Sequence, residues 1–349
     1  MPTVQATSSK LLFLFAIVVL LVLAALNMVL GSVHIPFADV VHILSGQKSE
    51  NVIWENILIR TRLPQTLTAL SAGMGLGIAG LLMQTLFRNP LAGPSVLGIS
   101  SGASLGVAFV LLVAGQAFSF SLSQWGFWGD VAVAGASFGG AMAVLIIILL
   151  ISKKVGGTLS VLIMGVMIGY LSNSIVGILK YYSLEEDVRN YVFWGLGSFS
   201  RLPLERAGLF VLVTLALSVL CLFLSKPLNL LALGDHYASN LGLNIKRARF
   251  LIIFSSGILT AWVTAFCGPI IFIGLAVPHL AKMTSRTSNH FRLIISSFIL
   301  GGATALLCNL IARLPGLDSE LPINSVTAFV GAPVVISVIL RRRKEKVVE

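Results

Sequence analysis

Apolar runs long enough to cross a lipid bilayer recur along this sequence, and they constrain its fold more than any other feature. A membrane-spanning helix needs roughly 20 predominantly apolar residues, and residues 11–30, 131–152 and 204–224 are the clearest such runs. Of the 349 residues, 56% are hydrophobic and only 11% are charged, whereas a soluble domain has about 25% charged residues. The chain is therefore predicted to be an all-α polytopic membrane protein.

The hydrophobic pattern predicts about ten transmembrane helices, with both termini on one side of the membrane. The first run is interpreted as a retained span, because it is longer than a typical signal sequence and no small-residue cleavage site follows it. No soluble domain is expected, so residues 1–349 form a single transmembrane domain. The predicted spans cover residues 11–32, 62–86, 95–114, 130–152, 158–181, 206–225, 248–267, 270–284, 291–312 and 323–340.

The charged residues divide unevenly between the two sides of this topology. About two thirds of the 24 Lys and Arg residues, but few of the 13 Asp and Glu residues, fall on the side of the termini. A bias of Lys and Arg marks the cytoplasmic side, so both termini are predicted to be cytoplasmic. The formal net charge of +11 then reflects orientation in the membrane, and nucleic acid is not expected as a partner.

Two segments are predicted to interrupt helices within the membrane. One is residues 87–94 and the other is residues 267–279, each containing Gly and Pro. Non-helical backbone at membrane depth is tolerated where it is buried in protein or lines a water-filled path. The two breaks fall at corresponding points of residues 62–181 and 248–340, which run in opposite directions, so inverted-repeat halves are predicted.

Small residues repeat at helical spacing in several of the predicted spans. Gly98, Gly102 and Gly106 recur every four residues, a pattern that lets helix backbones approach closely. The three cysteines lie within or at the edges of apolar runs without metal-ligand spacing, so they are interpreted as packing residues. They are Cys221, Cys267 and Cys308.

Chemistry for energising transport is missing from the predicted membrane interior. All Asp and Glu residues fall in loops or at span ends, whereas ion-coupled carriers usually hold a carboxylate in mid-membrane. The sequence has neither an HExxH motif nor a GxxxxGK[ST] nucleotide loop. A transport role therefore requires an external motor, and a membrane-embedded enzyme or passive channel is the alternative of a different class.

The cytoplasmic segment 226–249, where Asp235 is predicted to cap a short helix, either lies in the lipid interface or contacts a partner.

Several blocks of sequence in a fixed order resemble one family. They are Arg62-Leu63-Pro64, Leu86 to Ala103, Gly268 to His279, Glu320 to Ala328 and Gly331-Ala332-Pro333. These blocks resemble the FecCD-type permeases, the membrane subunits of ATP-binding-cassette importers for iron–siderophores, haem and cobalamin.

The resemblance implies a set of partners and a location. It implies a second permease subunit, with a homodimer expected, two cytoplasmic ATPase subunits, and a periplasmic or lipid-anchored substrate-binding protein. The chain would lie in the bacterial inner membrane, in contact with membrane lipid. Because the partner ATPases bind ATP and Mg, this chain is expected to hold no cofactor, metal or catalytic residue and not to be an enzyme.

The family's functional positions are carried over onto this sequence as follows. Arg62 and Arg313 match basic positions that receive the binding protein, while Gln65 replaces a second arginine and nearby Arg60 is a candidate substitute for it. The ATPase coupling helices are expected at about residues 231–249, with coupling residues Gly234, Asp235, His236, Leu241 and Gly242. The expected gate and pathway residues are Asn89, Leu91, Thr158, Met164, Met167, Ser172 and Asn173.

The sequence does not identify the cargo, because a binding protein delivers it to the permease and the pathway is expected to bind it only weakly. Ferric siderophore is expected because it is the commonest cargo of the family. Cobalamin, haem or an oxyanion such as molybdate are the alternatives. Haem would call for a His or Tyr ligand in the pathway, and Tyr170 is the one candidate.

Overall fold

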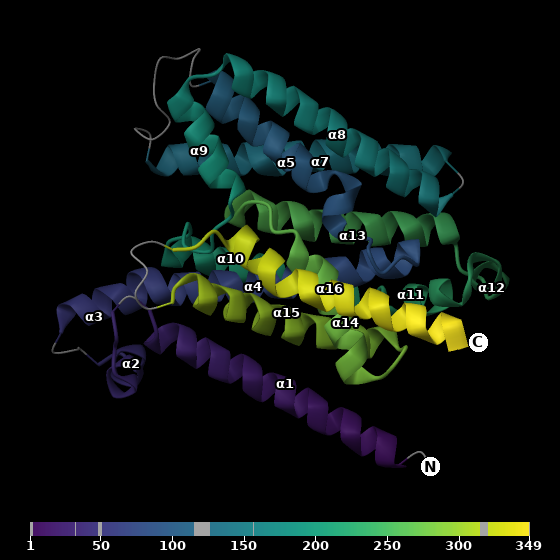
Figure 1. Ribbon diagram of the computed structural model, residues 1–349, viewed down its shortest axis with the longest axis horizontal. Helices are drawn as coiled ribbons and strands as arrows, with labels where there is room; N and C mark the ends of the chain where they lie inside the picture. Colours follow the sequence, from purple (N-terminus) through teal and green to yellow (C-terminus); the bar gives the residue numbers. More distant parts are fainter. Residues whose placement is uncertain are drawn as a thin grey trace. The chain divides into compact units, whose positions relative to one another are not determined.

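The computed structural model describes residues 3–31, 33–47, 51–114, 126–155, 157–314 and 320–348 (Figure 1). Within these residues all regular structure is helical. The chain forms two compact units: Met1–Ile78, Ser198–Leu220 and Phe272–Glu349 make up unit 1, and Ala79–Gly197 and Cys221–Ile271 make up unit 2. Each unit takes segments from both predicted halves, so these halves are not separate packing units.

Unit 1 is built around α15, which packs against α1, α14 and α16. In Figure 1, α1 begins and α16 ends on the same side of this unit. The helices of unit 1 are α1 (Thr3–Val29), α2 (Phe37–Leu44), α3 (Val52–Ile57), the π-helical turn η1 (Leu58–Arg62), the first part of α4 (Leu63–Phe87), α10 (Leu204–Leu222), α14 (Phe272–Ser285), α15 (His290–Ala312) and α16 (Ile323–Val348).

Unit 2 is built around α7, which packs against α5 and α13, while α5 also packs against α8. The helices after the end of α4 are the 3-10 turn η2 (Pro94–Leu97), α5 (Ile99–Ala108), the π-helical turn η3 (Phe109–Ala114), α7 (Phe127–Lys154), α8 (Thr158–Tyr182), α9 (Glu185–Gly195), α11 (Ser225–Leu233), α12 (Asp235–Asn240) and α13 (Ile245–Cys267).

The described residues contain seven helices that are long and apolar enough to cross a membrane, and two shorter apolar helices at Ile99–Val113 and Ile323–Ser337. Each of the ten predicted spans overlaps a helix, which confirms the predicted membrane fold class. The predicted span 95–114 is less regular than expected, because it divides into η2, α5 and η3.

The predicted close helix packing is confirmed where α5 meets α7. A Cβ atom added to Gly106 would lie 2.1 Å from the carbonyl oxygen of Ala136, and one added to Gly140 would lie 2.2 Å from that of Gly102. No side chain fits at such distances, so glycine is required for the two backbones to touch.

Both predicted helix breaks are present, but the second is shorter than expected. Helix α4 ends at Phe87, and Gly98, with a φ of 76°, separates η2 from α5. The second break is confined to the residues between Cys267 and Phe272, because α14 continues through Pro278. A proline removes one backbone donor, and packing within a membrane helix accommodates that loss.

Candidate functional site

One corner of unit 1, named the outer corner after its predicted external position, is organised by a buried arginine. Arg62 is 1% exposed and donates hydrogen bonds to the carbonyl oxygens of Met28 and Val29, both at 2.8 Å, and to that of Val33. Because α1 ends at Val29, the carbonyls of Met28 and Val29 have no partner within the helix. A cation at a helix C-terminus also complements the helix dipole, so Arg62 caps α1.

Arg313 lies beside Arg62 and contacts the first of a series of polar side chains. A Cβ atom on Gly31 would lie 3.0 Å from terminal guanidinium nitrogens of both Arg62 and Arg313. Arg313 Nε lies 3.9 Å from Glu320 Oε1. Burial lowers the pKa of Arg313, and the charge of Glu320 opposes that shift. Gly31 is therefore the point at which the two guanidinium groups come together.

A buried amide network continues from this corner into the membrane helices. Gln65 Nε2 donates to Glu320 Oε1 and to Asn309 Oδ1, each at 3.1 Å. Asn309 Nδ2 donates to Asn27 Oδ1 at 2.8 Å, and Asn27 Nδ2 donates to the carbonyl oxygen of Leu306 at 3.0 Å. The network ties α1, α4 and α15 together through side chains that would be costly to bury alone.

The structure brings together three of the four positions expected to dock the binding protein. Arg62, Gln65 and Arg313 share the corner, and Arg60 is exposed on η1. The sequence analysis missed Asn27, Asn309 and Glu320. A polar residue inside an apolar run was the available signal for the two asparagines, because such residues are rare in membrane helices. Glu320, in a loop, carried no such signal.

The expected coupling segment contains the end of the short helix α11 and the whole of the short helix α12. Gly234 (φ 121°) joins α11 to α12, and Gly242 (φ 82°) follows α12. Such backbone angles favour glycine. His236 and Leu241 are exposed and available to a partner.

The prediction that Asp235 caps a helix is wrong, because Gly234 is the N-cap residue and the Asp235 carboxylate has other partners. Arg88 donates to Asp235 Oδ1 at 3.2 Å, and Arg249 donates to Oδ2 at 2.5 Å. Arg88 also donates to the carbonyl oxygen of Leu231 at 2.8 Å, near the end of α11. Asp235 thus joins α12 to the start of α13 and to the loop after α4.

That loop contains the expected gate residues Asn89 and Leu91. The Asn89 side chain accepts a hydrogen bond from the backbone N–H of Leu91 at 2.9 Å, a local turn typical of asparagine. The Leu91 side chain is 45% exposed. This loop, the expected gate loop, therefore presents an apolar side chain from a turn that immediately follows Arg88.

A cavity of about 320 Å³ lies in unit 2 where η2 and the start of α5 meet α8. Its lining carries hydroxyl and amide groups and no formally charged side chain. The lining residues are Ser95, Val96, Gly98, Ser100, Ser101, Val166, Gly169, Tyr170, Asn173 and Ile271. A Cβ atom on Gly98 would lie 2.7 Å from the carbonyl oxygen of Gly165, so glycine holds the break against α8.

The expected pathway residues divide between different surfaces of α8. Asn173 lines the cavity, whereas Ser172 is buried. Met164 and Met167 are exposed on α8, and Thr158 is its first residue. The cavity serines 95, 100 and 101 were missed, because a serine beside a glycine break has no distinctive spacing.

Among the described residues, no group of three or more His, Cys, Asp or Glu side chains is placed to hold a metal ion. Cys221, Cys267 and Cys308 are buried, and none forms a disulfide.

Comparison with known proteins identifies relatives over nearly the whole chain. Residues 17–341 match the family model described as the FecCD transport family. The chain is 35% identical over 299 residues to the vitamin B12 import system permease protein BtuC of Citrobacter koseri, covering 85% of each chain. It is 34% identical over 336 residues to the hemin transport system permease protein HmuU of Yersinia pestis, covering 96% of each.

Solved structures support the same assignment. A chain from an inward-facing, metal-chelate type ABC transporter matches with a TM-score of 0.81 at 30% identity, covering 95% of this chain and 99% of that one. The PsaBC structure from Streptococcus pneumoniae matches with a TM-score of 0.52 at 14% identity, a likeness of fold alone. The chain therefore belongs to the FecCD transport family and is a membrane permease subunit of a metal-chelate ABC importer, not itself an enzyme.

Proposed function

We propose that this permease receives a ferric siderophore from a binding protein and passes it to the cytoplasm by alternating access, driven by two ATPase subunits that bind ATP and Mg. A homodimer of the chain would form the pathway in the bacterial inner membrane, with both termini cytoplasmic. The bias of Lys and Arg toward the side of the termini supports this orientation.

The single observation that carries the transport mechanism is the shared carboxylate of Asp235. It is bound at once by Arg249 at the start of α13 and by Arg88, the residue directly before the gate residue Asn89. A push by the ATPase partners on α11 and α12 would then move the gate loop through one ionic junction. Rigid elements joined in this way convert a local displacement into a switch between two states.

The two ion pairs of Asp235 differ in strength, and the weaker one can break during a conformational change. The Arg88 and Asp235 side chains are 50% and 43% exposed, and ion pairs this exposed contribute at most about 1 kcal/mol. The Arg249 side chain is only 16% exposed, so its contact with Asp235 is better shielded from water. The Arg88 contact is thus the one that could open without large loss of stability.

The lining of the α5–α8 cavity supports a chelate as the cargo. Hydroxyl and amide groups form weak hydrogen bonds with the oxygen-rich surface of a siderophore, and weak contacts allow release. A cationic lining would favour an oxyanion such as molybdate, and none of the described side chains that line the cavity is cationic.

Haem is the second candidate cargo, on the strength of one residue. Tyr170 lines the cavity and is 64% exposed, and a tyrosine oxygen is a known axial ligand of haem iron. The hemin permease among the relatives and the vitamin B12 permease make haem and cobalamin the cargoes against which siderophore must be compared.

The outer corner is proposed to dock the binding protein. Arg313 lies in this corner with Glu320, and Arg62 and Gln65 hold the corner together. Arg60 would add an exposed charge from η1. Complementary charge at such a rim mainly sets orientation and association rate.

The test of the cargo is ATP-driven uptake by the complete importer in proteoliposomes, with its own binding protein and ATPase subunits. Ferric siderophore, haem, cobalamin and molybdate are compared at equal concentration. Siderophore uptake that requires ATP and the binding protein is the expected result. Uptake of haem alone, lost in Tyr170→Phe, would mean that haem is the cargo. Uptake of molybdate alone would contradict the inference that the cavity lining favours a chelate.

A further inference from the structure

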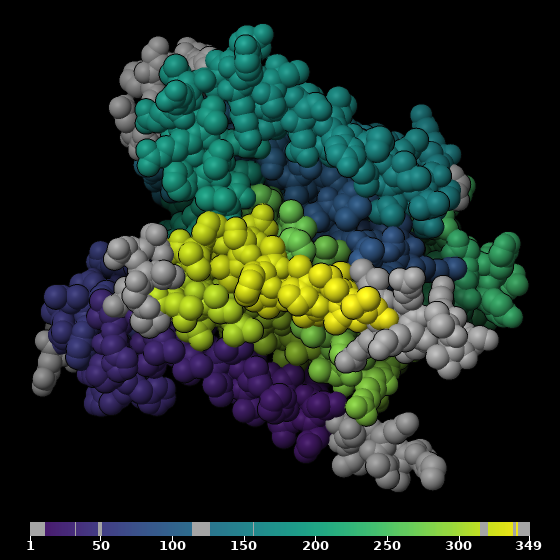
Figure 2. All heavy atoms as spheres, in the orientation of Figure 1, coloured from purple at the N-terminus to yellow at the C-terminus, as the bar shows by residue number. Residues whose placement is uncertain are grey.

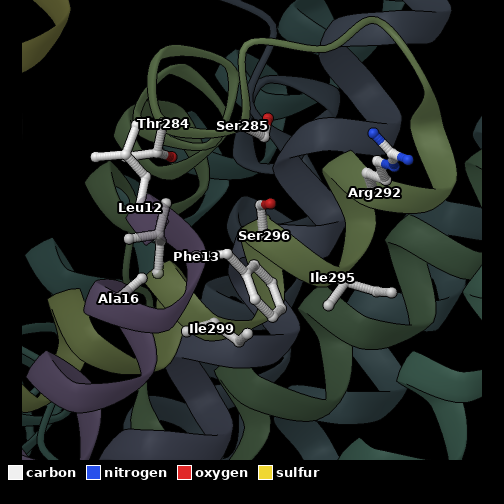
Figure 3. A pocket seen from close by; sticks show the side chains of 10 residues that line it. Leu12, Phe13, Ala16, Thr284, Ser285, Arg292, Ile295, Ser296 and Ile299 are labelled. Atoms are coloured by element: carbon white, nitrogen blue, oxygen red, sulfur yellow. The ribbon is translucent and has the colours of Figure 1, made fainter. Parts of the chain in front are cut away.

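Unit 1 contains a second cavity, of about 330 Å³, between α1, the end of α14 and the first turns of α15 (Figure 3). It belongs neither to the outer corner nor to the α5–α8 cavity. The lining residues are Leu12, Phe13, Ala16, Thr284, Ser285, Arg292, Ile295, Ser296, Ile299 and Leu300. Its volume lies in the usual range of small-molecule sites, about 300–1,000 Å³.

The two ends of this cavity differ in chemistry. In Figure 3 the hydroxyl oxygens of Ser285 and Ser296 lie on the side of the Arg292 guanidinium, and the side chains of Phe13 and Ile299 lie on the opposite side. One end therefore offers a positive charge and hydrogen-bonding groups, and the other offers hydrocarbon. A ligand that fills both ends must be amphiphilic.

The polar groups at the charged end are available to a ligand. Arg292 is exposed, and neither an ion pair nor a hydrogen bond engages it among the described residues. The Ser296 side chain is 6% exposed, and its hydroxyl likewise has no partner in the described part of the chain. By contrast, the Ser285 hydroxyl already donates to the carbonyl oxygen of Ala281.

The cavity lies at the edge of the membrane. Arg292 is the third residue of the span His290–Ala312, and Leu12 is the second residue of the span Leu11–Val29, so both spans begin beside it. From Arg292 to Leu300 a helix rises about 12 Å, which takes the apolar end into the hydrocarbon layer. Only 17% of the most apolar stretch of the α1 span is buried, and the purple atoms of α1 lie at the surface in Figure 2.

We propose that this cavity binds an anionic phospholipid of the membrane, with its phosphate at Arg292 and Ser296 and part of an acyl chain against Phe13 and Ile299. Basic residues at a membrane surface attract anionic lipids, and an arginine at a span end is at head-group depth. A second membrane-spanning helix is a poorer occupant, because acidic side chains are rare in such helices, and a helix without one would cover Arg292 and leave its charge unpaired. The bound lipid would hold α1 against α15.

The test is native mass spectrometry of the full-length chain in detergent, titrated with dioleoyl phosphatidylglycerol or with dioleoyl phosphatidylcholine. Arg292→Gln should weaken phosphatidylglycerol binding about fivefold, the effect of one basic residue near a membrane surface. It should weaken phosphatidylcholine binding less, because the choline cation opposes the attraction of that lipid's phosphate to Arg292. Arg286→Gln is the matched control, because Arg286 is exposed in the loop before α15 and does not line the cavity. Arg292→Lys should retain binding.

Three results would overturn the proposal. Equal affinity of the unmodified chain for both lipids would remove the role of the charge. Equal losses in the two glutamine variants would mean diffuse surface attraction in place of a site. Displacement of phosphatidylglycerol by millimolar inorganic phosphate would mean an anion site without a hydrocarbon component. The first and third results come from the unmodified chain, so they do not depend on how the variants fold.

Discussion

At the scale of single residues, the two most informative charges have opposite surroundings. Arg62 is almost completely buried and donates hydrogen bonds to backbone carbonyl oxygens at the end of α1. Asp235 is partly exposed and forms ion pairs with two arginines from different segments. The first arrangement favours stability, since an uncompensated helix end is costly. The second favours motion, since exposed ion pairs open easily.

Arg62→Ala should destabilise the protein without a change in cargo preference. The substitution leaves the Met28, Val29 and Val33 carbonyl oxygens without their donor, and hydrogen bonds to a charged group contribute about 1.5–3 kcal/mol each. We expect a clear fall in the thermal unfolding midpoint in detergent. Arg60→Ala is the control and should change stability by at most about 0.5 kcal/mol, because Arg60 is on the surface. Equal midpoints for the two variants would contradict the capping role.

Asp235→Asn should uncouple ATP hydrolysis from uptake. The change removes the charge that holds Arg88 and Arg249, and the free energy that couples two sites in a protein is typically about 1–3 kcal/mol. Uptake per ATP hydrolysed by the reconstituted importer should fall, while the ATPase subunits stay bound. Asp235→Glu preserves the charge and should recover part of the coupling. An unchanged ratio in Asp235→Asn would exclude the ionic junction as the route.

At the scale of elements, glycines decide which helices touch. The α5–α7 contact depends on backbones too close for any side chain, and the repeat of glycines at every fourth position already indicated such a face. The break between η2 and α5 is likewise set by Gly98, whose φ of 76° and contact with α8 both favour glycine. The partner helix in each case was not predictable, because the spacing of the glycines indicates which face of a helix packs closely but not which other helix packs against it.

Gly106→Ala should therefore destabilise unit 2, whereas Gly135→Ala should not. A Cβ atom at Gly106 meets the Ala136 carbonyl oxygen at 2.1 Å, and one at Gly135 meets nothing within 4 Å. Overpacking of this kind costs typically about 1–3 kcal/mol. Thermal unfolding of both purified variants gives the comparison, and a Gly106→Ala midpoint at or above that of Gly135→Ala would contradict the tight contact.

At the scale of the whole molecule, the bias of Lys and Arg predicts the orientation of the chain, and its family implies ATPase partners. The proposed orientation places the segment 231–249 in the cytoplasm, where ATPase subunits can reach it, and places residues 183–206 outside. The three native cysteines are buried, so a single introduced cysteine can report on its own side of the membrane.

A cysteine at Ser200 should react with a membrane-impermeant maleimide in intact spheroplasts, because Ser200 is exposed in the proposed external loop. A cysteine at Ser239, exposed on α12, should react only after permeabilisation. The parent chain is the control for background labelling. The reverse pattern would invert the topology and with it the assignment of the coupling helices.

The sequence by itself determined the membrane class, the approximate spans, the helix breaks and the family, because all of these depend on short-range patterns of hydrophobicity, glycine, proline and motif order. Only the tertiary structure decided that Arg62 is a buried cap, that Asp235 links Arg88 to Arg249, and that Asn27, Gln65 and Asn309 form one network. Those contacts join residues far apart in the chain, up to 282 positions in the case of Asn27 and Asn309. Side chains at such separations meet only through the packing of whole helices, which no local pattern encodes.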